Sequence, residues 1–259
     1  MGDLDKRLEL AIDLVDHAGR LLRPRFRAPI AIETKADLSP VSEADREVEL
    51  AMRALVERSA PGDGFIGEEF DPVRPDGDYV WVVDPIDGTR AFLAGLPTFV
   101  ILVALLRGGV PVLGIIDQPV TGDRWVGAVG RPTTFGGRAA RTRTCSALSH
   151  ALLACTDPFL LPPSAAEPFA RLAGAARTRV TGGDGLLFGL LASGHVDVVC
   201  EAGLGLHDFA ALGPIVVGAG GWIGDWRGAP LARDSEGLVL ATGDPNLAAE
   251  ARARLAAAI

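Results

Sequence analysis

The most informative stretch of the chain is Trp81-Val82-Val83-Asp84-Pro85-Ile86-Asp87-Gly88-Thr89-Arg90-Ala91-Phe92. A short buried strand, predicted over residues 79–84, ends there in the carboxylate of Asp84. Asp87 supplies a second carboxylate three residues later, and Gly88 and Thr89 open the next segment. Backbone N–H groups in such a turn, or at the start of a helix, form a site for an anion. The stretch therefore combines two acidic side chains with a predicted anion site.

This combination of charges points to a divalent cation. Two carboxylates beside an anion site should repel the anion, and a cation between them removes the conflict. Oxygen ligands favour Mg²⁺, Mn²⁺ or Ca²⁺, and Mg²⁺ often combines few carboxylates with waters and a substrate phosphate. A plain reverse turn is the alternative, because Asp-Gly is a common turn dipeptide. A phosphatase class with a nucleophilic Asp fits poorly, because it needs the second Asp two residues after the first.

Further carboxylates stand on both sides of this stretch. Glu68 and Glu69 follow two apolar residues, which favours an anchored pair over a solvated acidic loop. Asp208 and Asp45 each stand where a predicted helix begins, so helix capping is a strong alternative for both. His207 has no partner histidine at a ligand spacing, which favours a structural role.

Composition excludes several classes of protein. The chain has 259 residues, 48% hydrophobic and 22% charged, as in a globular protein of one or two domains. Its formal net charge of −8 argues against nucleic-acid binding, which requires Lys and Arg on phosphates. Three cysteines without a C-x-x-C spacing suit a reducing compartment. The longest apolar stretch, residues 98–106, is too short to cross a bilayer, and the N-terminus does not read as a signal peptide. We therefore expect a cytoplasmic protein that does not enter a membrane.

The periodicity of apolar residues predicts a mixed α/β fold. Amphipathic helices are predicted over residues 4–22 and 45–60, with a polar loop at 33–40 between them. Later strands separated by short turns should be antiparallel neighbours, and the second half alternates strands with helices. These strands are predicted at 98–106, 110–116, 124–129, 152–155 and 196–200, and the helices at 164–176, 186–193, 208–219 and 246–258. A composition shift at residues 138–149 separates two halves, 1–140 and 141–259, which we expect to share one compact domain, 1–259.

Taken together, these motifs resemble the inositol monophosphatase family of metal-dependent phosphatases over almost the whole chain. The order and separation of the motifs fit, and several segments look most like the histidinol-phosphatase branch. The family matches are Pro40-Val41-Ser42-Glu43-Ala44-Asp45, Gly67-Glu68-Glu69, Asp84-Pro85-Ile86-Asp87-Gly88-Thr89 and Asp208-Phe209-Ala210-Ala211 running into Gly218-Ala219-Gly220-Gly221. The branch matches are Thr89-Arg90-Ala91-Phe92, Gly114-Ile115-Ile116-Asp117-Gln118-Pro119, Gly182-Gly183-Asp184 and Glu201-Ala202-Gly203-Leu204.

The resemblance implies a layered α-β-α-β-α sandwich, a homodimer and a cluster of two or three Mg²⁺ ions, for which Mn²⁺ could substitute. It implies that Glu68, Asp84 and the carbonyl of Ile86 hold one metal, and that Asp84, Asp87 and Asp208 hold a second. The resemblance places Glu69 just outside the metal ligands. It also implies that the backbone N–H groups of Gly88 and Thr89 bind the phosphate, and that Asp45 and Thr89 orient the attacking water together with Glu68. Lys35 and its loop would close over the site.

The resemblance also implies where the leaving group lies. Asp184 and Glu201 would stand beside the alcohol of a small phosphorylated metabolite. The chain departs from the family at His207, where relatives usually carry an aromatic residue such as Trp or Tyr. We expect a phosphomonoesterase that hydrolyses L-histidinol phosphate with a metal-activated water. The alternatives are inositol 1-phosphate, a broad activity on small phosphate esters, and an inactive metal-binding protein.

Overall fold

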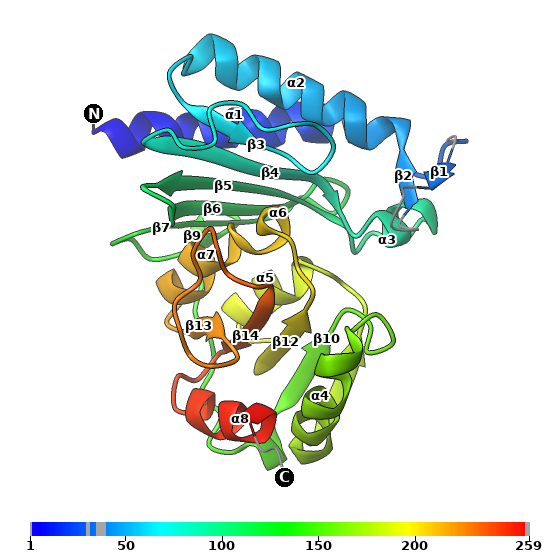
Figure 1. The fold of residues 1–259 in the computed structure, drawn as a ribbon, viewed down its shortest axis with the longest axis vertical. Coiled ribbons are helices and arrows are strands. Elements are labelled where there is room, and N and C mark those ends of the chain that lie inside the picture. The colour runs from blue at the N-terminus through cyan, green and yellow to red at the C-terminus, as the bar shows by residue number, and fades with distance from the viewer. Residues whose placement is uncertain (1, 30–31, 35–39, 257–259) are drawn as a thin grey trace.

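The computed structural model describes residues 2–29, 32–34 and 40–256, and the elements of these residues stack in five layers (Figure 1). A pair of helices covers a large sheet, short helices fill the space below it, and a smaller sheet and a second pair of helices complete the stack. The layered α-β-α-β-α sandwich implied by the resemblance is confirmed.

The first layer consists of α1 (Asp3–Leu22) and α2 (Glu43–Ser59). Both helices present an apolar stripe to the large sheet, where Leu14 and Met52 pack in one core cluster with Trp81 of the sheet. This burial is the reason that the spacing of apolar residues predicts both helices. In the predicted polar loop, the described residues form a short antiparallel pair, β1 (Ile32–Thr34) and β2 (Pro40–Ser42). Lys35 lies outside the described residues.

The large sheet contains seven strands in the described chain, and they follow one another in sequence order. All neighbours are antiparallel except β3 and β4. The strands are β3 (Gly64–Ile66), β4 (Tyr79–Asp87), β5 (Val100–Arg107), β6 (Val110–Gln118), β7 (Asp123–Ala128), β8 (Thr134–Phe135) and β9 (Arg138–Ala139). The predicted strand 79–84 continues to Asp87, with an irregularity of register between Asp84 and Asp87. Such an irregularity re-aims side chains at the end of a strand.

Short helices form the middle layer: α5 (Leu186–Ala192), α6 (Leu206–Phe209) and α7 (Leu212–Gly218). The single helix predicted at 208–219 is therefore wrong, and the break between α6 and α7 has a chemical reason. Pro214 lacks the N–H that a continuous helix would donate to the carbonyl of Ala210. α7 lies directly on the large sheet, because a Cβ at Gly127 would be 2.6 Å from the backbone nitrogen of Ile215.

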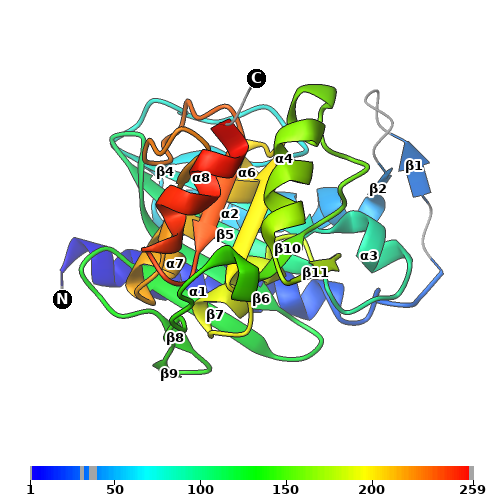
Figure 2. The ribbon, with the colours of Figure 1, turned by 90° about the horizontal axis from the view of Figure 1, so that it is seen from below.

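The second sheet contains five strands within the described residues, in the order β11-β10-β12-β14-β13. The strands are β10 (Leu152–Cys155), β11 (Thr178–Thr181), β12 (Val198–Ala202), β13 (Trp222–Asp225) and β14 (Leu238–Thr242). Helices α4 (Pro163–Ala175) and α8 (Leu247–Ala256) cover its outer face side by side (Figure 2). β12 extends two residues beyond the predicted strand, so Glu201 lies within the strand rather than after it. No helix in the described part of the chain combines the length and the apolar character needed to cross a bilayer.

Candidate active site

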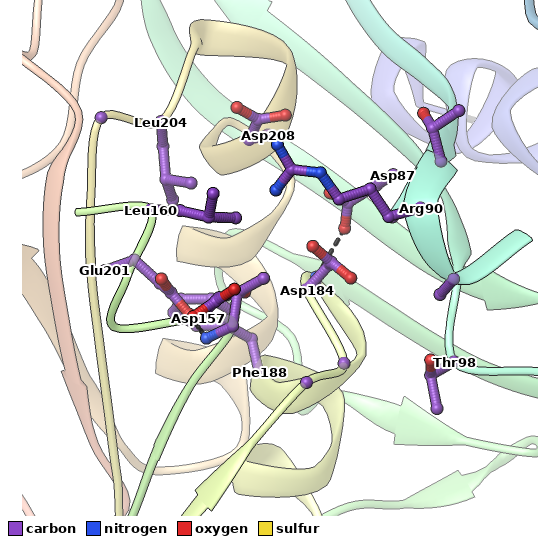
Figure 3. A pocket seen from close by; sticks show the side chains of 18 of the residues that line it. Asp87, Arg90, Thr98, Asp157, Leu160, Asp184, Phe188, Glu201, Leu204 and Asp208 are labelled. Atoms are coloured by element: carbon purple, nitrogen blue, oxygen red, sulfur yellow. Dashed lines mark hydrogen bonds between the residues drawn. The ribbon is translucent and has the colours of Figure 1, made fainter. Parts of the chain in front are cut away.

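A cavity of about 610 Å³ lies where the large sheet, the middle layer and the small sheet meet. The end of β4, helix α3 (Thr89–Leu93), the segment before α5, strand β12 and helix α6 all contribute to its wall. Seven of the residues that the sequence singles out line it together: Glu68, Asp87, Gly88, Thr89, Asp184, Glu201 and Asp208. Figure 3 shows Asp87, Asp184 and Asp208 grouped near Arg90, with Glu201 on the left of the view.

Among the described residues, two overlapping sets of side chains could hold a metal ion. Within each set, one possible ligand atom per residue lies within 4.8 Å of the others. Asp84, Asp87 and Asp208 form the first set, as the resemblance implies. Glu68 and Asp84 form the second with His207, which the sequence favours as structural. The carboxylate oxygens fit a hard divalent cation, so the donor set is compatible with the predicted metal.

Each aspartate of the first set is oriented by a backbone N–H. Asp84 Oδ1 accepts a hydrogen bond from the nitrogen of Ile86 at 2.9 Å. Asp87 Oδ2 accepts from the nitrogen of Gly185 at 2.5 Å, and Asp208 Oδ2 accepts from that of Gly205 at 2.6 Å. Each hydrogen bond engages one oxygen of its carboxylate. The three side chains are therefore held in place before any cation binds.

The electrostatics of the cluster also fit a cation. Burial raises the pKa of Asp84 well above its usual range, and the nearby charges of Glu68, Asp87 and Asp208 raise it further. Burial, followed by the charges of Asp184 and Asp208, likewise raises the pKa of Asp87. Burial raises the pKa of Asp208. Like charges crowded in a poorly solvated site resist ionisation, and a bound dication would reverse this preference.

The turn after β4 brings Gly88 and Thr89 to the cavity. Gly88 adopts a left-handed φ of 91°, and a Cβ there would lie 2.7 Å from Asp184 Oδ2. Only glycine accommodates both the conformation and the close approach. The Thr89 hydroxyl donates to the carbonyl of Ile86 at 3.2 Å. The predicted phosphate contacts of the two N–H groups and the predicted metal contact of Ile86 stay predictions.

The two carboxylates expected near the leaving group have different surroundings. Asp184 adopts a left-handed φ of 42° at the position before Gly185, which is the N-cap of α5. Burial and the charge of Asp208 raise the pKa of Asp184 to about 6. Glu201 Oε1 accepts hydrogen bonds from the N–H and the hydroxyl of Thr156, at 2.6 and 2.9 Å. Burial raises the pKa of Glu201 to about 7.

The raised pKa of Glu201 predicts a pH-dependent stability. Below the unfolded pKa of 4.5, the carboxyl is protonated in both the folded and the unfolded chain. As the pH rises from 4.5 to about 7, the folded chain binds more protons than the unfolded chain, so the free energy of unfolding falls. The difference amounts to roughly 3 kcal/mol at 1.36 kcal/mol per unit. Glu201→Gln removes this loss and keeps an acceptor for Thr156. Urea unfolding without metal should show the variant gaining on the wild type by this amount between pH 4 and pH 8. The exposed Glu167→Gln is the control, and parallel stability curves for Glu201→Gln and wild type would contradict the prediction.

Two further predicted residues, Asp45 and Glu69, are not among the described residues that line the cavity. Asp45 is buried in the first turn of α2 and is not among the described residues that line the cavity, so its contact with water stays a prediction. The backbone N–H of Glu69 donates to Glu49 Oε2 at 2.7 Å. Glu49 is fully buried, and its carboxylate occupies the space that a side chain at Gly67 would need. Glu49 thus supports the loop that carries Glu68, a role that the sequence analysis missed.

The sequence and the fold have known relatives. A family model described as the inositol monophosphatase family matches residues 3–259. The chain is 40% identical to the chloroplastic bifunctional phosphatase IMPL2 of Arabidopsis thaliana, over 93% of this chain and 70% of that protein. It is 39% identical to the histidinol-phosphatase of Mycobacterium tuberculosis, over 83% of this chain and 85% of that protein. A solved inositol monophosphatase from Zymomonas mobilis aligns with a TM-score of 0.91 and 47% identity, over 98% of this chain and 99% of that one.

The family match, the shared fold and the acidic cluster agree with one another. The match spans the described site residues from Glu68 to Asp208. Glu68, Asp87 and Asp208 belong to the metal-binding sets and also line the cavity. The chain therefore belongs to the inositol monophosphatase family of metal-dependent phosphatases.

Proposed function

We propose that the protein is a Mg²⁺-dependent phosphomonoesterase that hydrolyses L-histidinol phosphate. The substrate proposal rests on a pair of acidic side chains, Asp184 and Glu201, which line the same cavity as Asp87 and Asp208 of the metal-binding sets. Neither belongs to a metal-binding set among the described residues. They are therefore available to the alcohol part of a substrate whose phosphate is held by the metal cluster.

In the proposed reaction, the divalent cations and the residues around them have different roles. When bound, divalent cations supply a nucleophilic water at neutral pH and stabilise the charge of the phosphate and of the leaving oxygen. The hydroxyl of Thr89, oriented by the Ile86 carbonyl, positions the attacking water together with Glu68 and Asp45. The backbone N–H groups of Gly88 and Thr89 hold the phosphate. No covalent bond between enzyme and phosphate is required.

The charge of the substrate favours histidinol phosphate. Histidinol carries an ammonium group and a titratable imidazole, and both form charge-assisted hydrogen bonds with carboxylates. A cation beside Glu201 would also favour ionisation of that buried carboxyl. The relative from Mycobacterium tuberculosis bears the name histidinol-phosphatase, which supports the same substrate.

Inositol 1-phosphate is the second candidate substrate. The solved relative from Zymomonas mobilis is called an inositol monophosphatase, and it is 47% identical to this chain. A neutral polyol needs hydroxyl acceptors, which a single carboxylate can provide. An assay of turnover on a generic phosphomonoester would distinguish an active phosphatase, whether specific for one of these substrates or of broad specificity, from an inactive metal-binding protein.

The substrate proposal predicts an order of kcat/KM values. We expect kcat/KM for L-histidinol phosphate to exceed that for inositol 1-phosphate in the wild type. Glu201→Gln should cost the cationic substrate roughly 1.5–3 kcal/mol of transition-state stabilisation through loss of a charge-assisted hydrogen bond. The loss for inositol 1-phosphate should be smaller, and this substrate is the internal control. A wild type that prefers inositol 1-phosphate would overturn the substrate and leave the phosphatase activity standing.

We also propose that the enzyme is a cytoplasmic homodimer. Cys145, Cys155 and Cys200 are free and buried, which suits a reducing compartment. The homodimer is proposed from the family resemblance, and light scattering of the purified protein tests it. The net charge of −8 makes a small phosphorylated metabolite a better partner than a nucleic acid.

A further inference from the structure

We propose that His207 is a nitrogen ligand of the cation at the Glu68–Asp84 position, and that this position selects a first-row transition-metal dication over Mg²⁺. The inference rests on the metal-dependent function proposed above, but it concerns which ion occupies one position. It also separates the two positions chemically. The Asp84–Asp87–Asp208 position offers carboxylates, whereas the Glu68–Asp84–His207 position offers an imidazole in addition.

The spacing of the three side chains fits a shared cation. One ring nitrogen of His207 and one oxygen each of Glu68 and Asp84 lie within 4.8 Å of one another. Metal bonds to nitrogen and oxygen of about 2.0–2.2 Å place two ligands on the same ion at most about 4.4 Å apart. The upper limit of the observed separations exceeds this value by only about 0.4 Å, so the three donors lie close enough together to share one ion.

The local backbone makes room for the imidazole at this place. A Cβ at Gly205 would be 2.6 Å from Cε1 and 3.0 Å from Nε2 of His207, so a residue with a side chain would displace the ring. His207 Nε2 lies 3.4 Å from Asp208 Oδ1, at the edge of the acidic cluster. The ring is three-quarters buried, with 25% of the side chain exposed. It is thus held beside the cluster by packing rather than extended into solvent.

The proposed preference for a transition metal over Mg²⁺ follows from the chemistry of imidazole. Imidazole suits metals such as Zn²⁺, Fe²⁺ and Ni²⁺, whereas Mg²⁺ takes oxygen ligands almost entirely. Glu68 and Asp84 remain acceptable to either class of ion. The histidine is therefore the ligand that distinguishes this position, and its neighbour with three carboxylates keeps the chemistry of a Mg²⁺ site.

The test detects the atoms bound to the metal and does not depend on turnover. Metal-free protein is loaded with enough Mn²⁺ to fill both positions, and pulsed electron paramagnetic resonance detects ¹⁴N nuclei coupled to the metal. We expect a directly bound nitrogen in the wild type and in His150→Phe, which removes an exposed histidine far from the site in sequence. The coupling should disappear in His207→Phe and weaken in Gly205→Ala, which keeps the backbone N–H that donates a hydrogen bond to Asp208.

Calorimetry with single metals provides the second measurement. Zn²⁺ affinity should fall at least about tenfold in His207→Phe, since groups that support a metal site commonly contribute 10- to 100-fold in affinity. Mg²⁺ affinity should change less than Zn²⁺ affinity. A wild type without ¹⁴N coupling overturns the proposal even if the variant fails to fold, and so does unchanged Zn²⁺ affinity in a folded His207→Phe. Phosphatase turnover with Mg²⁺, measured in parallel, shows whether the proposed function survives such a result.

Discussion

Replacing Asp84 by asparagine should abolish turnover while leaving the protein folded. Asp84 belongs to both metal-binding sets, so Asp84→Asn weakens both at once. We expect a loss on the order of 10³-fold or more, because a catalytic metal contributes several kcal/mol and each 1.36 kcal/mol is tenfold in rate. Asparagine keeps an oxygen that can accept the hydrogen bond from Ile86. Turnover of a phosphomonoester with Mg²⁺ present measures the effect.

The same variant should be at least as stable as the wild type without metal. Burial raises the pKa of Asp84, so its ionised form destabilises the folded chain, and this cost grows as pH rises above the unfolded value. The advantage of the variant should therefore appear at neutral pH and vanish in acid. Asp76→Asn, which changes a largely exposed aspartate, serves as the control. Wild-type turnover in Asp84→Asn would show that the metal assignment is wrong.

Removal of the Thr89 hydroxyl should slow the chemical step more than it weakens substrate binding. Thr89→Ala is expected to lower kcat by on the order of 10²- to 10⁴-fold, as for the loss of a group that positions or protonates a reactant, with a smaller change in KM. Thr89→Ser keeps the hydroxyl and should restore much of the rate. Steady-state kinetics of the three proteins on one substrate measure both parameters.

A purely structural role for Thr89 predicts a different result. Thr89 is the first residue of α3, and its hydroxyl bonds to Ile86. If that hydrogen bond served only to fix the turn, Thr89→Ala would have a lower melting temperature with near-normal kcat. Thermal unfolding beside the kinetics separates these outcomes.

The local patterns in the sequence predict the parts of the fold that have strong periodicity. The apolar stripes of α1 and α2 and the apolar runs of β4 and β5 are visible in the sequence because each buries a continuous face. Strand β11 was missed because all four of its residues are exposed, which leaves no apolar pattern. The break between α6 and α7 depends on one proline inside an otherwise helical pattern.

The site could be predicted where its residues stand together in the chain. Asp84, Asp87, Gly88 and Thr89 stand close together in the chain, from the end of β4 to the start of α3, and their chemistry is visible in their order. Glu49 was missed because its spacing from Arg53 is that of an exposed helical ion pair, whereas the structure buries it under the loop of Glu68. His207 looks isolated in the sequence because Glu68 and Asp84, the other members of its metal-binding set, lie more than a hundred positions away.

The hydrogen bond from Gly185 to Asp87 has a consequence for how the enzyme tolerates change. It ties the end of β4 in the large sheet to the start of α5 in the middle layer, residues 98 positions apart. A metal ligand is thereby oriented by the docking of layers that fold from opposite halves of the chain. Substitutions deep in the packing between those layers can shift this oxygen without touching the cavity. Retention of the activity therefore depends on the packing between the two halves of the chain as well as on the acidic residues themselves.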